Sequence, residues 1–238
     1  MYSAGDTVTM FIKGFQKLTL LDYPGHTACT VFTGGCNLRC PFCHNALLVT
    51  EVDDAHYEEE EIFEHLRRRK GILDGVAVTG GEPLIQKDIE RFLYEIKCEG
   101  YPVKLDTNGT FPDRLKDIIS AELVDYIAVD IKNSKEKYAQ TTGIKDFDVS
   151  AVEKTVEILA QSNVDYEFRT TVVKQFHTPE DILNIAEWIK GAPRYFLQNF
   201  VDSGNLIDET CSGVEKSVMY EMLEKAKEYV PNTQLRGL

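Results

Sequence analysis

The stretch ACTVFTGGCNLRCPFCHN, residues 28–45, carries most of the information about the fold and chemistry of this chain. Its first six residues form an apolar run of the kind that fills a buried strand. Three cysteines follow, Cys36, Cys40 and Cys43, with the spacing C-x3-C-x2-C. A buried strand that runs straight into such a loop places metal-binding chemistry at the end of that strand. We expect the cluster-binding loop to cover residues 34–50.

The number of cysteines in this loop separates the kinds of metal site. A [4Fe–4S] cluster is usually held by four thiolates, so three cysteines leave one iron open to a small molecule. A structural zinc site is the alternative, but it needs four ligands, and chain stiffness hinders joint ligation by His44 and the adjacent Cys43. Six cysteines in 238 residues do not make a disulfide-dense chain. Cys29, Cys98 and Cys211 are isolated in the sequence and are interpreted as buried or incidental thiols.

Composition favours one domain over residues 1–238. Hydrophobic residues make up 43 % of the chain, and no linker, repeat or low-complexity tract divides it. We expect no membrane span, because no apolar run reaches about 18 residues, and the lack of a recognisable secretory leader favours the cytoplasm. The net charge of −13 argues against a nucleic-acid partner, since phosphate binding depends on clustered Lys and Arg. Residues 1–27 are interpreted as an amino-terminal extension, with a polar, mobile tail at 1–9.

Apolar runs alternate with helical patterns along the rest of the chain. The predicted strands cover residues 28–33, 75–79, 103–106, 126–131, 165–173 and 195–199. The predicted helices cover residues 57–70, 87–99, 113–120, 134–140, 149–161, 179–190 and 214–229. Strands that are each followed by a helix imply parallel pairing with right-handed crossovers. Because eight such units close a full barrel, we predict an α/β fold with an incomplete (β/α)6 TIM-like barrel, open along one side.

Unusual residues gather where the predicted strands end, the edge at which parallel barrels place their chemistry. The second strand ends in Thr79-Gly80-Gly81-Glu82-Pro83, where the glycines permit close backbone approach and the carboxylate can meet a ligand ammonium group. A plain turn would use the same residues. The third and fourth strands end in Asp106-Thr107 and Asp130-Ile131-Lys132. These two carboxylates repel one another unless a cation or hydrogen-bond donors separate them. The alternative is that each caps the turn that follows it.

Arg169 is the unusual residue of the fifth predicted strand, in a run otherwise suited to burial. A buried arginine needs an anionic partner. A bound ligand is one candidate, and structural pairing with Asp130 or Glu167 is the other.

The combined pattern resembles the radical S-adenosylmethionine (SAM) enzymes, which share the six-unit barrel. In that family SAM chelates the open iron of the cluster, and an electron from the reduced cluster cleaves SAM to a 5′-deoxyadenosyl radical. The resemblance implies that Cys36, Cys40 and Cys43 hold one [4Fe–4S] cluster. It places Phe42 near the adenine and the Gly80-Gly81-Glu82 segment at the SAM amino group.

The D-T-N-G segment at Asp106 and the D-x-K segment at Asp130 are similar to those of glycyl radical enzyme activating enzymes, notably the pyruvate formate-lyase activator. There the matching aspartates and threonine help to bind a monovalent cation beside the SAM carboxylate. The resemblance implies this role for Asp106, Thr107 and Asp130. Lys132 matches a lysine near SAM, and Arg169 is implied to contact SAM.

Residues 14–25, GFQKLTLLDYPG, narrow the resemblance to the anaerobic ribonucleoside-triphosphate reductase activating proteins. The implied reaction removes a hydrogen atom from a glycine Cα of a glycyl radical enzyme, with electrons from a flavodoxin or ferredoxin. The chain lacks the ferredoxin-like insert of many activators, so we predict a single cluster. It also lacks the histidine that packs beside adenine in the pyruvate formate-lyase activator, and Gln198 or Asn199 is the candidate for that place.

Other functions stay open at this point. A radical SAM enzyme acting on a small molecule, such as a modified-purine synthase, shares the six-strand frame, and the activator of a different glycyl radical enzyme shares the motifs. A non-catalytic cluster- or zinc-binding protein explains the cysteines but not the segments at the other strand ends.

Single substitutions test the three-cysteine site. Cys36→Ala, Cys40→Ala or Cys43→Ala should each abolish the cluster after anaerobic reconstitution, because a cubane held by two thiolates loses a further iron ligand. Iron and sulfide analysis should give about four of each per wild-type chain. The matched controls, which should keep the cluster, are Cys29→Ala, Cys98→Ala and Cys211→Ala. Loss of the cluster in any control would contradict an open iron.

Overall fold

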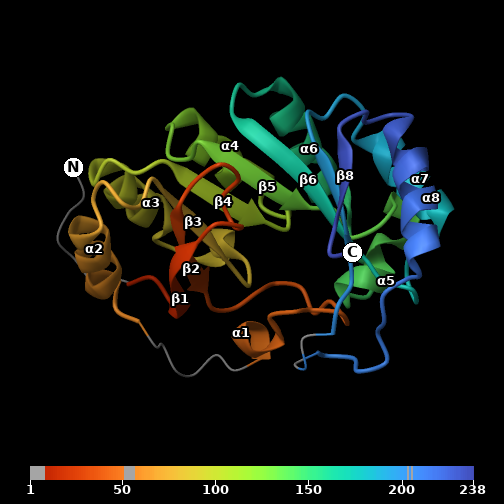
Figure 1. Ribbon diagram of the computed structural model, residues 1–238, viewed down its shortest axis with the longest axis horizontal. Coiled ribbons are helices and arrows are strands. Elements are labelled where there is room, and N and C mark those ends of the chain that lie inside the picture. Colours follow the sequence, from red (N-terminus) through yellow and green to blue (C-terminus); the bar gives the residue numbers. More distant parts are fainter. Residues whose placement is uncertain (1–8, 51–56, 203, 205) are drawn as a thin grey trace.

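One eight-stranded sheet forms the centre of the molecule (Figure 1). A computed structural model describes residues 9–50, 57–202, 204 and 206–238, so most of the predicted tail at 1–9 lies outside the described residues. The strands are β1 (Ile12–Thr19), β2 (Ala28–Thr33), β3 (Gly75–Gly80), β4 (Val103–Thr107), β5 (Tyr126–Asp130), β6 (Asp165–Val172), β7 (Tyr195–Asn199) and β8 (Thr233–Arg236). They lie in the order of the chain, with β1 antiparallel to β2 and every later pair parallel.

The helices connect the parallel strands and surround the curved sheet (Figure 1). They are α1 (Ala46–Thr50), α2 (Glu59–Arg68), α3 (Ile89–Cys98), α4 (Pro112–Ser120), α5 (Tyr138–Thr142), α6 (Ser150–Gln161), α7 (Pro179–Trp188) and α8 (Lys216–Lys227), with single 3-10 turns η1 (Pro83–Ile85) and η2 (Lys135–Lys137). Sequence chemistry fixes their ends: α7 begins at a capping box in which Thr178 and Asp181 bond each other's backbone. Within the described ranges, no helix is long and apolar enough to cross a membrane.

The predicted incomplete barrel is confirmed. The six predicted strands are β2 to β7, and each is followed by at least one helix. Within the described part of the chain no pairing joins β1 to β8, so the sheet does not close.

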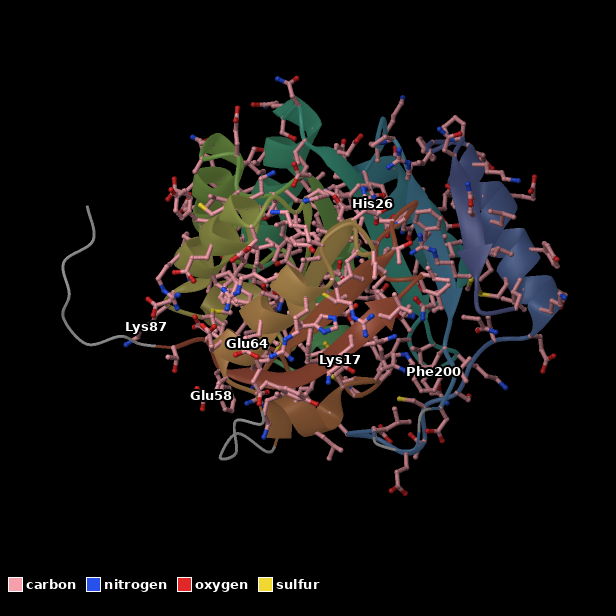
Figure 2. The ribbon with its side chains drawn as sticks, turned by 60° about the vertical axis from the view of Figure 1, so that its left-hand side comes forward. Lys17, His26, Glu58, Glu64, Lys87 and Phe200 are labelled. Carbon is pink, nitrogen blue, oxygen red and sulfur yellow. The ribbon has the colours of Figure 1, made fainter. Side chains whose placement is uncertain are left out.

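Two edge strands were missed by the sequence analysis. β1 lies inside the predicted amino-terminal extension, and β8 has only four residues. Both are sheet edges, so neither needs the continuous apolar run that marks a strand buried on both faces. The outer edge of β1 is covered in part by α2: a ring nitrogen of His65 lies 3.0 Å from the carbonyl oxygen of Lys17. Lys17 and Glu64 line the same small hollow there (Figure 2).

Alternate residues of the central strands face opposite environments, as strand geometry requires. In β4, Val103 and Leu105 pack in the main hydrophobic core. Lys104 lies between them and points into the barrel, where it is only 1 % exposed. β6 repeats this arrangement, with Phe168 in the main core and Glu167 buried on the inner side. At β4 and β6 the barrel interior therefore holds charged side chains, while apolar packing holds the helices to the outside.

Glu167 shows how an interior charge is satisfied. Its Oε2 accepts a hydrogen bond from the Tyr126 hydroxyl at 2.7 Å, and its Oε1 accepts one from Arg236 Nη1 of β8 at 3.1 Å. The Arg236 guanidinium also lies over the ring of Phe196, 3.4 Å from its centroid. The sequence analysis gave a pair between Arg169 and Glu167 as one structural alternative. In the structure, Glu167 pairs with Arg236 of β8 instead.

Replacing Arg236 tests whether β8 is anchored by charge. Arg236→Met keeps an apolar stem over Phe196 but leaves Glu167 without its cationic partner, so the free energy of unfolding should fall by about 1–3 kcal/mol. Arg68→Met is the matched control, because Arg68 pairs with Glu64 on the exposed surface of α2 and should cost less than about 0.5 kcal/mol. Urea unfolding measures both. Equal, small losses would contradict the anchoring role.

Candidate functional site

A cavity of about 330 Å³ opens where the parallel strands end. Eleven of the twelve residues predicted for the site line it: Cys36, Phe42, Cys40, Cys43, Gly80, Gly81, Asp106, Thr107, Asp130, Lys132 and Arg169. Glu82 is the exception, since its side chain is fully buried behind the cavity wall. The structure thus brings the cysteine loop and the ends of β3 to β6 to one place.

The cysteine loop is held by backbone contacts. A turn is closed by the Cys43 N–H, which donates to the Cys40 carbonyl at 3.0 Å, and the Arg39 N–H donates to the carbonyl of Thr142 at 2.8 Å. Glycine is required where β3 meets this loop: a Cβ on Gly81 would lie 1.9 Å from the carbonyl oxygen of Gly35. Gly81, the residue after β3, therefore lets the strand end lie directly against the loop, and a Cβ on Gly80, the last residue of β3, would lie 2.3 Å from the backbone of Thr33 in β2.

Asn108, which the sequence analysis did not single out, ties β4 to the cysteine loop. Its Nδ2 donates to Asn37 Oδ1 at 2.9 Å and lies 3.8 Å from Cys36 Sγ. Its Oδ1 accepts from the backbone and hydroxyl of Thr110, which fixes the amide orientation. The sequence feature that could have identified Asn108 as a site residue is its position directly after Thr107 in the D-T-N-G segment.

Glu82 is a buried carboxylate with three donors. Its Oε1 accepts from the Leu84 N–H at 3.0 Å and from the Thr107 hydroxyl at 2.9 Å, and its Oε2 accepts from the Asn108 N–H at 2.6 Å. Burial raises the pKa of Glu82 to about 7, although the three hydrogen bonds oppose the shift. In this structure Glu82 therefore locks the end of β3 to the end of β4, and its predicted contact with a SAM amino group stays a prediction.

Arg169 lies between the two carboxylates at the strand ends. Its Nε donates to Asp130 Oδ1 at 2.9 Å, and its Nη1 donates to Asp106 Oδ2 at 3.0 Å. Lys104 binds the other oxygen of Asp106, and Lys132 Nζ lies 3.3 Å from the other oxygen of Asp130. Burial alone would raise the pKa of each aspartate, but the guanidinium and the nearest lysine hold both pKa values below their usual range. The side chains are ion-paired rather than capping turns, and pairing with Asp130 is the structural alternative foreseen for Arg169.

Gln198 and Asn199, the two candidates for the place beside the adenine, have different surroundings. Gln198 lines the cavity, whereas both amide atoms of Asn199 bond the backbone of Val214 at 3.0 and 3.1 Å. Phe42 is buried and packs against Phe176, with ring centroids 5.8 Å apart. We therefore retain Gln198, and not Asn199, as the candidate near strand β7.

The donor set around the loop fits an iron–sulfur cluster. Cys36, Cys40 and Cys43 face one cavity, and burial raises the pKa of the Cys40 thiol to about 11. A thiolate there needs nearby positive charge, which metal binding supplies. His44 Nε2 is buried without a hydrogen-bond partner among the described residues. The His44 ring lies against Phe200, the residue after β7, with ring centroids 5.1 Å apart. A polar ligand in the cavity would satisfy this nitrogen.

Cys211 is a buried free thiol, as the sequence analysis predicted. It is buried in a small hydrophobic cluster with Leu38, Cys40 and Phe42, so it covers the cysteine loop from the segment before α8. It does not line the cavity formed by the described residues.

The chain is similar in sequence to known proteins. The family described as the Radical SAM superfamily matches residues 30–190. The chain is 32 % identical over 235 residues to a Methanocaldococcus jannaschii protein whose proposed assignment is glycyl-radical enzyme activating enzyme, covering 95 % of this chain and 96 % of the relative. It is 35 % identical over 117 residues to the 7-carboxy-7-deazaguanine synthase of Hyperthermus butylicus, covering 48 % of this chain and 49 % of the synthase.

The fold is also similar to a solved structure, that of Streptococcus suis SuiB bound to S-adenosylmethionine. The TM-score is 0.68 at 16 % identity, and the match covers 85 % of this chain and 48 % of SuiB. At this identity the likeness concerns the fold.

The pKa of Glu82 makes a pH prediction. Because its value of about 7 lies above that of an unfolded glutamate, the folded protein binds more protons, and the stability contributed by this group falls as the pH rises through 7. Between pH 5.5 and 8 the wild type should lose about 2 kcal/mol more than Glu82→Gln, which cannot titrate. Urea unfolding at several pH values measures the difference. Glu221→Gln, on the exposed side of α8, should follow the wild type, and parallel profiles for Glu82→Gln and wild type would contradict the assignment.

Proposed function

Because this chain belongs to the radical SAM superfamily, we propose that it is an activating enzyme that removes a hydrogen atom from a glycine Cα of a glycyl radical enzyme. The observation that carries the proposal is the extent of one match: 95 % of this chain aligns with 96 % of a relative whose proposed assignment is glycyl-radical enzyme activating enzyme. A match of that extent takes in more than the cysteine loop and the barrel common to the superfamily.

Residues of the cavity suit the cluster, the adenine and the carboxylate of SAM. We propose Cys36, Cys40 and Cys43 as ligands of one [4Fe–4S] cluster whose remaining iron binds SAM. When bound, the two cofactors supply the electron and the hydrogen-abstracting radical. Phe42 provides an apolar surface beside the cysteines for the adenine ring. Lys132 lines the same cavity and gives it a cation that can face the SAM carboxylate.

The proposed substrate is a loop of a partner protein. A polypeptide segment must place a glycine Cα inside the barrel, and the unpaired edges of β1 and β8 leave the sheet open on one side. The segment GFQKLTLLDYPG at residues 14–25 supports the anaerobic ribonucleoside-triphosphate reductase as the partner. Flavodoxin or ferredoxin is the proposed electron donor, and the cytoplasm the proposed compartment.

A second candidate function is radical chemistry on a small molecule. The observation that favours it is the 35 % identity to a 7-carboxy-7-deazaguanine synthase. That match covers 48 % of this chain, against 95 % for the activating-enzyme relative. The part of the chain that the synthase leaves unmatched is therefore better explained by the activating role.

The fate of the hydrogen atom distinguishes the two functions. The reconstituted, reduced protein should form 5′-deoxyadenosine slowly alone and faster with an anaerobic ribonucleotide reductase. An EPR doublet from a single α-hydrogen should then appear on the reductase, in an amount equal to the additional 5′-deoxyadenosine that forms in the presence of the reductase. Deuterated glycine in the partner should collapse the doublet and transfer deuterium to 5′-deoxyadenosine.

Two controls accompany this experiment. Cys43→Ala should give neither product, and a partner whose target glycine is replaced by alanine should give no doublet. Deuterium arriving from a small metabolite, with no protein radical, would support the synthase-like function.

A further inference from the structure

Lys104 is a buried charge to which the sequence patterns assign no role. Its side chain extends from β4 into the barrel, is 2 % exposed, and pairs with Oδ1 of Asp106. Asp106 itself lines the cavity, whereas Lys104 lies behind it. A buried ammonium group is costly unless a paired anion compensates it. Its place beside a cavity carboxylate therefore calls for a reason.

The surroundings of Lys104 decide whether the monovalent cation implied by the family resemblance fits here. That cation would use the oxygens of Asp106, Thr107 and Asp130. The Thr107 hydroxyl donates to Glu82 at 2.9 Å and accepts from the Gly109 N–H at 3.1 Å. These bonds already use the hydroxyl hydrogen and one lone pair of Thr107.

The carboxylate oxygens are occupied as well. On Asp106, Lys104 binds Oδ1 and Arg169 Nη1 binds Oδ2 at 3.0 Å. On Asp130, Arg169 Nε binds Oδ1 at 2.9 Å and Lys132 Nζ lies 3.3 Å from Oδ2. Each of the four oxygens thus has a cationic donor of the chain itself.

The charge balance also argues against a monovalent cation at this place. Three cationic side chains surround two carboxylates, so the five groups together carry one excess positive charge before any ligand binds. Sodium or potassium would add a second positive charge and would have to exchange its water for oxygens that are already paired. A small monovalent cation does not fit this arrangement.

We propose that the Lys104 ammonium takes the place of that cation, so that SAM binding in this protein is independent of sodium and potassium. Lys104 acts as a positioning residue: it balances the charge of Asp106 and leaves Arg169 free to bridge both aspartates. The excess positive charge then faces the carboxylate of SAM through Lys132. The inference rests on the SAM binding proposed above, and not on the identity of the partner.

Equilibrium dialysis of SAM with the anaerobically reconstituted full chain tests the proposal. Buffers of equal ionic strength contain potassium, sodium or tetramethylammonium as the only monovalent cation. The wild-type dissociation constant should stay within about twofold across the three, because screening is matched. In tetramethylammonium, Lys104→Met should bind SAM about tenfold more weakly, and potassium or sodium should restore most of the loss by entering the space of the ammonium group. Lys97→Met is the matched control, because Lys97 pairs with Asp125 on the outside of the barrel, and it should behave as wild type.

A second readout does not need the cofactors. The midpoint of thermal unfolding of the cluster-free Lys104→Met protein should rise when potassium replaces tetramethylammonium, while that of the wild type and of Lys97→Met should not. A wild-type SAM affinity that falls fivefold or more in tetramethylammonium would overturn the proposal, as would a Lys104→Met protein indifferent to the cation. If Lys104→Met does not fold, the SAM affinity of the wild type in the three buffers tests the proposal by itself. Absence of SAM binding by the wild type in every buffer would instead refute the proposed function.

Discussion

The row of ion pairs inside the barrel is the interaction on which the cavity depends. It runs from Lys104 to Asp106, through Arg169 to Asp130 and on to Lys132. These side chains come from β4, β5, β6 and the segment just after β5, so the pairs act across strands that backbone hydrogen bonds already hold in register. A buried ion pair adds little stability compared with apolar packing, but removing one partner is costly. The row therefore fixes where charge sits in the cavity more than it stabilises the fold.

Glu82 performs the corresponding task between the strand ends and the cysteine loop. Its carboxylate joins the ends of β3 and β4 through Thr107 and Asn108. One residue earlier, Gly81 fits against the loop where a side chain would not. Gly81 and Glu82 thus serve one purpose, since the backbone contact of Gly81 sets the position of the loop and the buried carboxylate of Glu82 keeps the strand end from moving. Asn108 then reaches back to Cys36.

Much of this could be predicted from sequence because it is local. Six strands, their helices and the gathering of eleven site residues at one cavity follow from apolar runs and from the rule that parallel strands end together. The misses involve contacts between distant residues. The pairing of Glu167 with Arg236 joins residues 69 positions apart, and the strand that carries Arg236 is too short and polar to be recognised. Likewise, the sequence around Lys104 is that of an ordinary strand lysine. Only the folded sheet shows that Lys104 shares Asp106 with the guanidinium of Arg169 from β6.

The open side of the barrel connects the fold with a macromolecular substrate. An open sheet has two edges, and an exposed edge invites pairing with another chain. Here both edges are protected. At β1, the His65 ring of α2 contacts the Lys17 carbonyl, and an isolated antiparallel β-bridge pairs Ile12 with Tyr57. At the other edge, β8 is only four residues long. Pairing of β1 with β8 would close the barrel and would wall off the cavity from that side. Protected edges allow the barrel to stay open without aggregation, and an open barrel is what a polypeptide needs if its backbone, rather than a small molecule, is to reach the cavity.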